Sequence, residues 1–278
     1  MSGAAVAQRC AVLAGFGAVL AVGIGLIADG AARAASPRCG QAAVASSNTL
    51  DYCLHPGPGP LLVLLSGLGN DLRSWSPSFL EALTRVAGVL VYDRRGYGQS
   101  SAPSPQPVTA EAVAADLHRL LQALRIGEPV VLVGHSLGGL YAQYFARNHP
   151  QQVAAVVLID AASPFEPIDD PRFATRASLE PGTVEHDEDA GVDLSILQTR
   201  DSPPMPRVPL LVLTATDHAS PAAFEREWQH IQAQVAAQSP LGRQVIAEGS
   251  GHDIQNDQPG LVVDQIRELL RQLGAAAR

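Results

Sequence analysis

Ser136 is the centre of the stretch Gly134-His135-Ser136-Leu137-Gly138, which lies between two expected elements of secondary structure. The preceding residues, 129–133, are apolar and mostly β-branched, which predicts a buried strand, and residues 140–149 favour a helix. A strand can turn this sharply into a helix only where no Cβ crowds the chain, and glycine flanks the turn on both sides. The pattern G-x-S-x-G in this setting predicts a nucleophile elbow, in which a strained backbone exposes the serine hydroxyl. The alternative is a plain structural turn.

A base and an acid that would serve this serine follow later apolar runs of the chain. His252 comes after the last such run, and Asp217 comes after the one before it. Because the carboxyl ends of parallel strands meet at one edge of a sheet, we expect Ser136, Asp217 and His252 to converge there. The imidazole would take the hydroxyl proton during attack on a carbonyl, and the carboxylate would fix the tautomer of the imidazole. Asp160 also ends an apolar run and is the alternative acid.

The elements that must position these residues alternate between strand-like and helix-like patterns. Short apolar runs predict strands at residues 61–65, 89–93, 129–133, 153–159, 209–215 and 243–247. Helical periodicity or capping signals predict helices at residues 74–87, 109–124 and 259–273, and another that begins at residues 220–221. Residues 40–55 predict a strand pair at the sheet edge. The fold class is therefore α/β, with a mostly parallel twisted sheet covered by helices on both faces.

Several of these motifs resemble those of the α/β-hydrolase superfamily. They are the elbow, the chain order serine, aspartate, histidine, and the segment Asp93-Arg94-Arg95-Gly96-Tyr97-Gly98-Gln99-Ser100 after a predicted strand. The resemblance implies an α/β-hydrolase fold and a serine hydrolase that cleaves a carboxylic ester or related acyl bond through an acyl-enzyme, without a cofactor. It also implies an oxyanion hole formed by the backbone N–H groups of Leu68 and Leu137. Serine at position 66 departs from the commonest family form, which has histidine there.

Residues 163–205 interrupt the alternation of strands and helices and are rich in acids. Between residues 165 and 201, ten acidic residues stand against three arginines, an excess close to the formal net charge of −8 for the whole chain. The resemblance implies that this segment forms a cap over the active site, and the alternative is a disordered acidic loop. An acidic cap that faces the pocket would repel anionic substrates.

The first 34 residues predict a signal peptide or membrane anchor, so we expect one α/β-hydrolase domain over residues 35–278. Arg9 precedes an apolar run over residues 10–27, and Ala-Arg-Ala at residues 32–34 offers a cleavage site. The protein would be exported to the periplasm or medium, or anchored in the membrane if the segment is retained. Cleavage after residue 34 removes two arginines and one aspartate, which changes the net charge from −8 to −9. It leaves Cys39 and Cys53, which predict a disulfide, with two free thiols as the alternative.

Composition excludes several other classes of function. The chain contains no lysine, which excludes a Schiff base, a Ser–Lys dyad and a P-loop lysine. Its acidic balance and the lack of a basic stripe argue against nucleic acid as a partner, and two cysteines are too few for a metal site. We therefore expect a small acyl substrate and no metal. The remaining alternatives are a non-catalytic binding protein on the same fold, or a C–C hydrolase, aminopeptidase or perhydrolase that uses the same triad.

Overall fold

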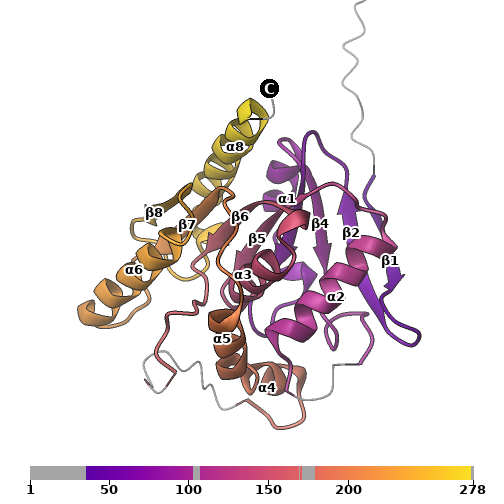
Figure 1. Ribbon diagram of the computed structural model, residues 1–278, viewed down its shortest axis with the longest axis horizontal. Helices are drawn as coiled ribbons and strands as arrows, with labels where there is room; N and C mark the ends of the chain where they lie inside the picture. Colours follow the sequence, from indigo (N-terminus) through magenta and orange to yellow (C-terminus); the bar gives the residue numbers. More distant parts are fainter. Residues whose placement is uncertain (1–35, 103–106, 169, 171–178, 277–278) are drawn as a thin grey trace, which may run out of the picture. The chain divides into compact units, whose positions relative to one another are not determined.

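An eight-stranded sheet carries the fold in the computed structural model, which describes residues 36–102, 107–168, 170 and 179–276 (Figure 1). The strands are β1 (Arg38–Ala43), β2 (Thr49–His55), β3 (Leu61–Leu65), β4 (Gly88–Tyr92), β5 (Val130–His135), β6 (Val153–Ile159), β7 (Leu210–Ala215) and β8 (Gly242–Ala247). Their order across the sheet is β1-β2-β4-β3-β5-β6-β7-β8. The pairs β1–β2 and β2–β4 are antiparallel, and every other neighbouring pair is parallel. The predicted mostly parallel sheet is confirmed.

Helices cover both faces of this sheet, as predicted. They are α1 (Pro77–Thr84), α2 (Ala110–Ala123), α3 (Leu137–Asn148), α4 (Val184–Asp189), α5 (Val192–Asp201), α6 (Ala222–Ala236), α7 (Ile254–Asp257) and α8 (Pro259–Ala276). Along β3, Leu62 and Leu64 pack with α1 and α8, whereas Val63 and Leu65 pack with α2 and α3. Successive strand residues point to opposite faces, so an uninterrupted apolar run is what a strand covered on both faces requires.

The edge of the sheet is an antiparallel pair that a disulfide cross-links. Cys39 of β1 lies opposite Cys53 of β2 in the strand register, and the two form a disulfide. Both the predicted edge pair and the predicted bridge are confirmed. Such a bridge stabilises a fold chiefly by restricting the unfolded chain.

Two helices, α4 and α5, lie within the segment predicted as a cap, so its described part is not an irregular loop. Helix α5 packs against α2 and α3. In α4, Asp187 and Glu188 are buried, although acids dominate this helix. Residues 34–278 group into one compact unit, and the predicted signal peptide or anchor over residues 1–34 lies outside the described residues. Among the described helices, none is both long and apolar enough to cross a membrane.

Candidate active site

Ser136 occupies a sharp turn between β5 and α3, and its backbone is strained. Its φ of 53° and ψ of −127° place a non-glycine residue in a sparsely populated region. The last residue of β6 and the loop that follows it hold this backbone on both sides. The Ser136 amide donates to the carbonyl of Ile159 at 3.2 Å, and the Ser136 carbonyl accepts from the amide of Ala162 at 2.9 Å. The strand, turn and helix predicted around the serine are therefore present.

Close backbone approach explains the glycine that follows the serine by two residues. A Cβ on Gly138 would lie 2.2 Å from the carbonyl oxygen of Leu65, so the start of α3 lies directly against the end of β3. A Cβ on Gly67 would come within 3.0 Å of the Ser136 Cβ. The loop after β3 and the elbow are thus in contact, as a shared oxyanion hole requires.

The two backbone N–H groups proposed for that hole lie on these two segments. Leu137 is the first residue of α3, where no helical carbonyl can accept from its amide, and the helix dipole there favours negative charge. Leu68 is in the loop directly after Gly67, and its amide has no acceptor among the hydrogen bonds of the described residues. Both amides therefore lie on the two segments that meet at Ser136.

The acid that contacts the imidazole is Asp160, not Asp217. Nδ1 of His252 lies 2.7 Å from Oδ2 of Asp160, whereas the Asp217 carboxylate accepts from the amide of Ala219 at 3.3 Å. The sequence analysis preferred Asp217, and the structure corrects that preference in favour of the alternative acid. The reason is positional, because Asp160 directly follows β6, the strand beside the elbow strand. Asp217 lies beyond the end of β7, which is one strand further from Ser136.

Four donors converge on the Asp160 carboxylate, which is fully buried. Oδ1 accepts from the Trp228 indole at 2.7 Å and from the amide of Ala215 at 3.0 Å. Oδ2 lies 2.7 Å from both Nε2 of His218 and Nδ1 of His252. Burial raises the pKa of Asp160. The hydrogen bonds from the two histidines lower the pKa by more than burial raises it, so the pKa lies well below its ordinary value. The carboxylate is therefore ionised at neutral pH.

His252 is positioned by its contacts with the residue that precedes the nucleophile. The carbonyl oxygen of His252 lies 3.2 Å from Nε2 of His135, and the two ring centroids are 4.8 Å apart. Burial lowers the pKa of His135 to about 4, so this second imidazole is neutral at neutral pH. With Nδ1 of His252 directed at Asp160, its Nε2 is the ring nitrogen that remains for proton exchange, and in the described structure no hydrogen bond joins it to Ser136. The His252 side chain is 44% exposed, which leaves it accessible to a substrate.

A buried ion pair links the loop after β3 to α4. The Arg94 guanidinium donates to the carbonyl oxygens of Ser66 and Gly67 at 2.7 and 2.9 Å, and its other donors contact the Glu188 carboxylate at 2.7 and 3.0 Å. Gly67 contributes the C=O of the peptide unit whose N–H belongs to Leu68. Because that unit is planar and trans, the bond from Arg94 fixes the direction in which the Leu68 N–H points.

Two tyrosines complete this cluster around Glu188. The Tyr97 hydroxyl donates to Glu188 at 2.7 Å and accepts from the amide of Gly69 at 3.1 Å, so it also holds the loop after β3. The Tyr141 hydroxyl donates to Glu188 at 3.2 Å. Nothing in an acidic helix marks one acid as buried, so the sequence pattern does not single out Glu188.

The sequence analysis also missed His218 as a partner of the proposed acid. Asp160, His218 and His252 place nitrogen and oxygen atoms within 4.8 Å of one another, the kind of group that can hold a metal ion. In the described structure, both imidazoles hydrogen-bond the same Asp160 carboxylate. The signal that marks His218 in the sequence is its position directly after Asp217, shortly beyond the end of β7.

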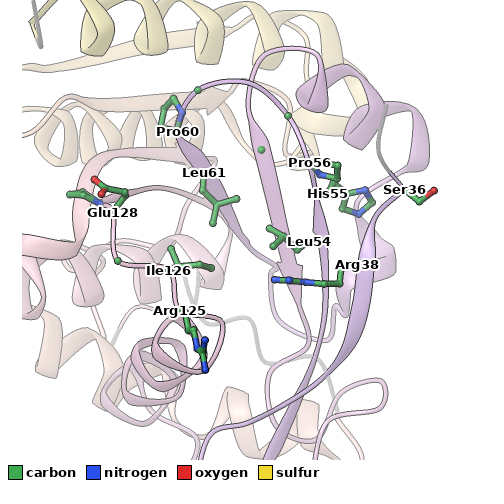
Figure 2. A pocket seen from close by; sticks show the side chains of 15 residues that line it. Ser36, Arg38, Leu54, His55, Pro56, Pro60, Leu61, Arg125, Ile126 and Glu128 are labelled. Carbon is green, nitrogen blue, oxygen red and sulfur yellow. The ribbon is translucent and has the colours of Figure 1, made fainter. Parts of the chain in front are cut away.

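A separate pocket of about 790 Å³ lies where the parallel strands β3, β4 and β5 begin, at the end of the sheet opposite to Ser136 (Figure 2). It is lined by the first residue of β3, the first residue of β4 and the residue before β5. Figure 2 shows Leu54, Leu61 and Ile126 around it, with Arg38 and Arg125 nearby. Ser136, Asp160 and His252 stand at the carboxyl ends of strands or beyond them, so this pocket is not the place where the triad would act.

Comparisons with known proteins agree with this architecture. A family model described as the alpha/beta hydrolase fold matches residues 60–189. The uncharacterized protein YqjL of Bacillus subtilis is 27% identical over 210 residues, which cover 73% of this chain and 81% of that protein. A protein of Pseudomonas savastanoi named "Putative carbamate hydrolase RutD" is 40% identical over 127 residues, but the match spans only 46% of this chain and 48% of that protein.

A solved structure extends the likeness over nearly the whole fold. A thermophilic esterase from Thermogutta terrifontis is 26% identical and superposes with a TM-score of 0.62 over 86% of this chain and 99% of that one. The family match covers the elbow, the loop after β3 and the strands that carry them. The structural match adds the later strands of the sheet. From the sheet order, the elbow and these matches, we conclude that the protein has the alpha/beta hydrolase fold.

Proposed function

We propose that this protein is a serine hydrolase that cleaves a carboxylic ester or a related acyl bond through Ser136, His252 and Asp160. The observation that carries the proposal is the 2.7 Å contact between His252 and a buried, ionised Asp160, beside a serine held in a strained elbow. A protein that only binds ligands has no need for a hydroxyl, an imidazole and a carboxylate at one edge of a sheet. The likeness to a thermophilic esterase adds support for an acyl substrate.

The proposed reaction proceeds in two halves through a covalent intermediate. Oγ of Ser136 attacks the carbonyl carbon while Nε2 of His252 takes the hydroxyl proton, and the oxyanion that forms accepts from the Leu68 and Leu137 amides. The tetrahedral intermediate expels the alkoxide, which receives the proton from His252, and an acyl-serine remains. Water, deprotonated by the same nitrogen, then attacks the acyl carbon and regenerates the hydroxyl. Throughout, Asp160 holds Nδ1 and stabilises the imidazolium.

The first experiment asks whether Ser136 is a nucleophile at all. A fluorophosphonate probe should label protein that lacks residues 1–34, and Ser136→Ala should abolish the labelling. In parallel, p-nitrophenyl esters of graded acyl length measure turnover and the depth of the pocket. A folded protein that neither reacts with the probe nor hydrolyses any ester would refute the proposal and favour a binding protein.

The second experiment decides which acid serves the imidazole, because both candidates can be changed with little loss of volume. Asp160→Asn should lower kcat by about 10³- to 10⁴-fold, since an amide favours the wrong tautomer of His252. Asp217→Asn is the matched control and should change kcat by less than about threefold, because its carboxylate bonds only the nearby Ala219 amide in the described structure. The opposite ranking of the two variants would restore Asp217 as the acid. Circular dichroism confirms that each variant is folded.

A further inference from the structure

We infer that His218 is a positioning residue: a positively charged imidazolium, held between two carboxylates, that clamps the Asp160 carboxylate which orients His252. This inference rests on the proposed function, because it concerns the base of that same site. His218 does not follow the last strand, where the family resemblance places the base, so the sequence pattern assigns it no role.

The hydrogen bonds of His218 fix its protonation state by geometry. Its Nε2 lies 2.7 Å from Oδ2 of Asp160, and its Nδ1 lies 2.8 Å from Oε2 of Glu225. Both partners are carboxylates, which accept hydrogen bonds when ionised, so each ring nitrogen must carry a proton. A neutral imidazole has only one N–H and cannot satisfy both contacts. His218 is therefore an imidazolium held between two acids.

The surroundings of His218 maintain that charge. Burial lowers the pKa of His218, but the hydrogen bonds and charges of Asp160 and Glu225 raise it to about 9. The backbone amide of His218 also donates to Oε1 of Glu225 at 3.0 Å, which fixes this acid against the loop. The side chain is only 12% exposed, so solvent screens these contacts weakly.

Each element packed against His218 contributes a defined group. From the loop after β6 comes Asp160, and from α6 come Glu225 and the rings of Phe224 and Trp228, whose centroids both lie 5.6 Å from the His218 ring. From the loop after β8 comes His252, with a ring centroid 6.2 Å away. The charged or titratable groups around His218 in the described structure are thus two acids and one further imidazole.

The consequence for catalysis follows from the oxygen that the two histidines share. Both contact Oδ2 of Asp160 at 2.7 Å, so one carboxylate oxygen holds the base and is itself held by His218. A doubly protonated His218 donates to this oxygen and fixes its position, which fixes the direction of the contact to Nδ1 of His252.

The test is a comparison of kcat and KM for a neutral p-nitrophenyl ester in His218→Gln. Glutamine donates an amide N–H to Asp160 but carries no charge. We expect kcat to fall by about tenfold and KM to change by less than about twofold, because His218 acts on the carboxylate that orients the base and not on the substrate. Glu225→Gln should lower kcat by less, because it leaves the contact between His218 and Asp160 in place. His118→Gln is the matched control, since His118 contacts only Gln152 and Gln122 by hydrogen bonds in the described structure and should leave kcat unchanged.

An NMR titration of the imidazole nitrogens in Ser136→Ala gives a readout that needs no turnover. The His218 ring should stay doubly protonated at pH 8, whereas in Glu225→Gln it should lose a proton at lower pH. The inference is overturned if His218 is neutral at pH 7, or if His218→Gln leaves kcat within about twofold of the parent. If no ester is hydrolysed at all, the proposed function fails, and the NMR result still decides the charge of His218.

Discussion

Deleting a single hydroxyl, in Tyr97→Phe, should lower kcat although Tyr97 lies outside the triad. The Tyr97 hydroxyl is the atom that joins Glu188 of α4 to the amide of Gly69, next to the Leu68 donor. Its removal leaves Arg94 to hold the loop after β3 through Ser66 and Gly67 alone. The charges of the buried ion pair are unchanged, so the perturbation tests how the oxyanion loop is held.

The expected losses of stability and of kcat follow from the two hydrogen bonds that the Tyr97 hydroxyl makes. Glu188 keeps its Arg94 contacts, and Gly69 is exposed enough to bond water, so we expect a loss of about 1–2 kcal/mol in the free energy of unfolding. Removal of a whole oxyanion donor costs about 10²- to 10³-fold in kcat. Tyr97→Phe leaves the Leu68 donor in place but less firmly oriented, so we expect a loss of about tenfold in kcat with a smaller change in KM.

Tyr141→Phe is the matched control, because it removes the other phenolic hydroxyl on the same carboxylate. Its hydroxyl donates to Glu188 at 3.2 Å and does not contact the loop after β3. We expect a similar loss of stability and a change in kcat of less than about twofold. Urea unfolding and steady-state kinetics on both variants separate the two effects. Equal losses of kcat in the two variants would refute a specific role for Tyr97 in holding the oxyanion loop.

Three further predictions concern stability and charge. Burial raises the pKa of Glu166 to about 8, so its contribution to stability is complete below about pH 4.5 and is lost as pH rises through 8, by at most about 1.4 kcal/mol per unit. Glu166→Gln should flatten the urea-measured stability between pH 5 and 8, and an unchanged slope contradicts this. Replacing Cys39 and Cys53 by serine should cost about 3 kcal/mol in the free energy of unfolding, and a loss below about 1 kcal/mol would argue against the bridge. Glu185 lies beside the loop after β3, because a Cβ on Gly69 would be 3.4 Å from the Cγ of Glu185. Its negative charge should therefore make an anionic ester turn over more slowly than its neutral isostere at low salt. Glu185→Gln should narrow that difference, and equal rates in the parent enzyme would exclude the effect.

The parts of the fold that the sequence predicted are those that local pattern determines. The run from Val130 to Val133 has no polar side chain, and a strand buried on both faces permits little else. The elbow was predictable because its glycine is required: a Cβ on Gly138 would clash with the carbonyl oxygen of Leu65. The facing cysteines Cys39 and Cys53 needed only two neighbouring strands joined by a short turn.

The acid was not predictable in the same way, because its partners are distant in the sequence. Asp160 and Asp217 each follow an apolar run, and both runs do become neighbouring parallel strands. What separates them is that Trp228, His218 and His252 all point at one carboxylate, and these side chains come from three later elements. No local pattern records such convergence, so the sequence could not separate the two acids correctly.

One four-residue turn after β6 supports both the nucleophile and the base. The carbonyl of Ile159 and the amide of Ala162 hold the backbone of Ser136, while Asp160, between them, holds His252. Asp160 and Ser136 both have positive φ, at 42° and 53°, a conformation that side chains normally avoid. Strain persists only where surrounding contacts over-determine it, and here the four bonds to the Asp160 carboxylate supply those contacts. An acid after β7 could hold an imidazole but could not also fix the serine backbone, because that backbone is bonded to the loop after β6. The position of the acid therefore couples the geometry of the elbow to the orientation of the base.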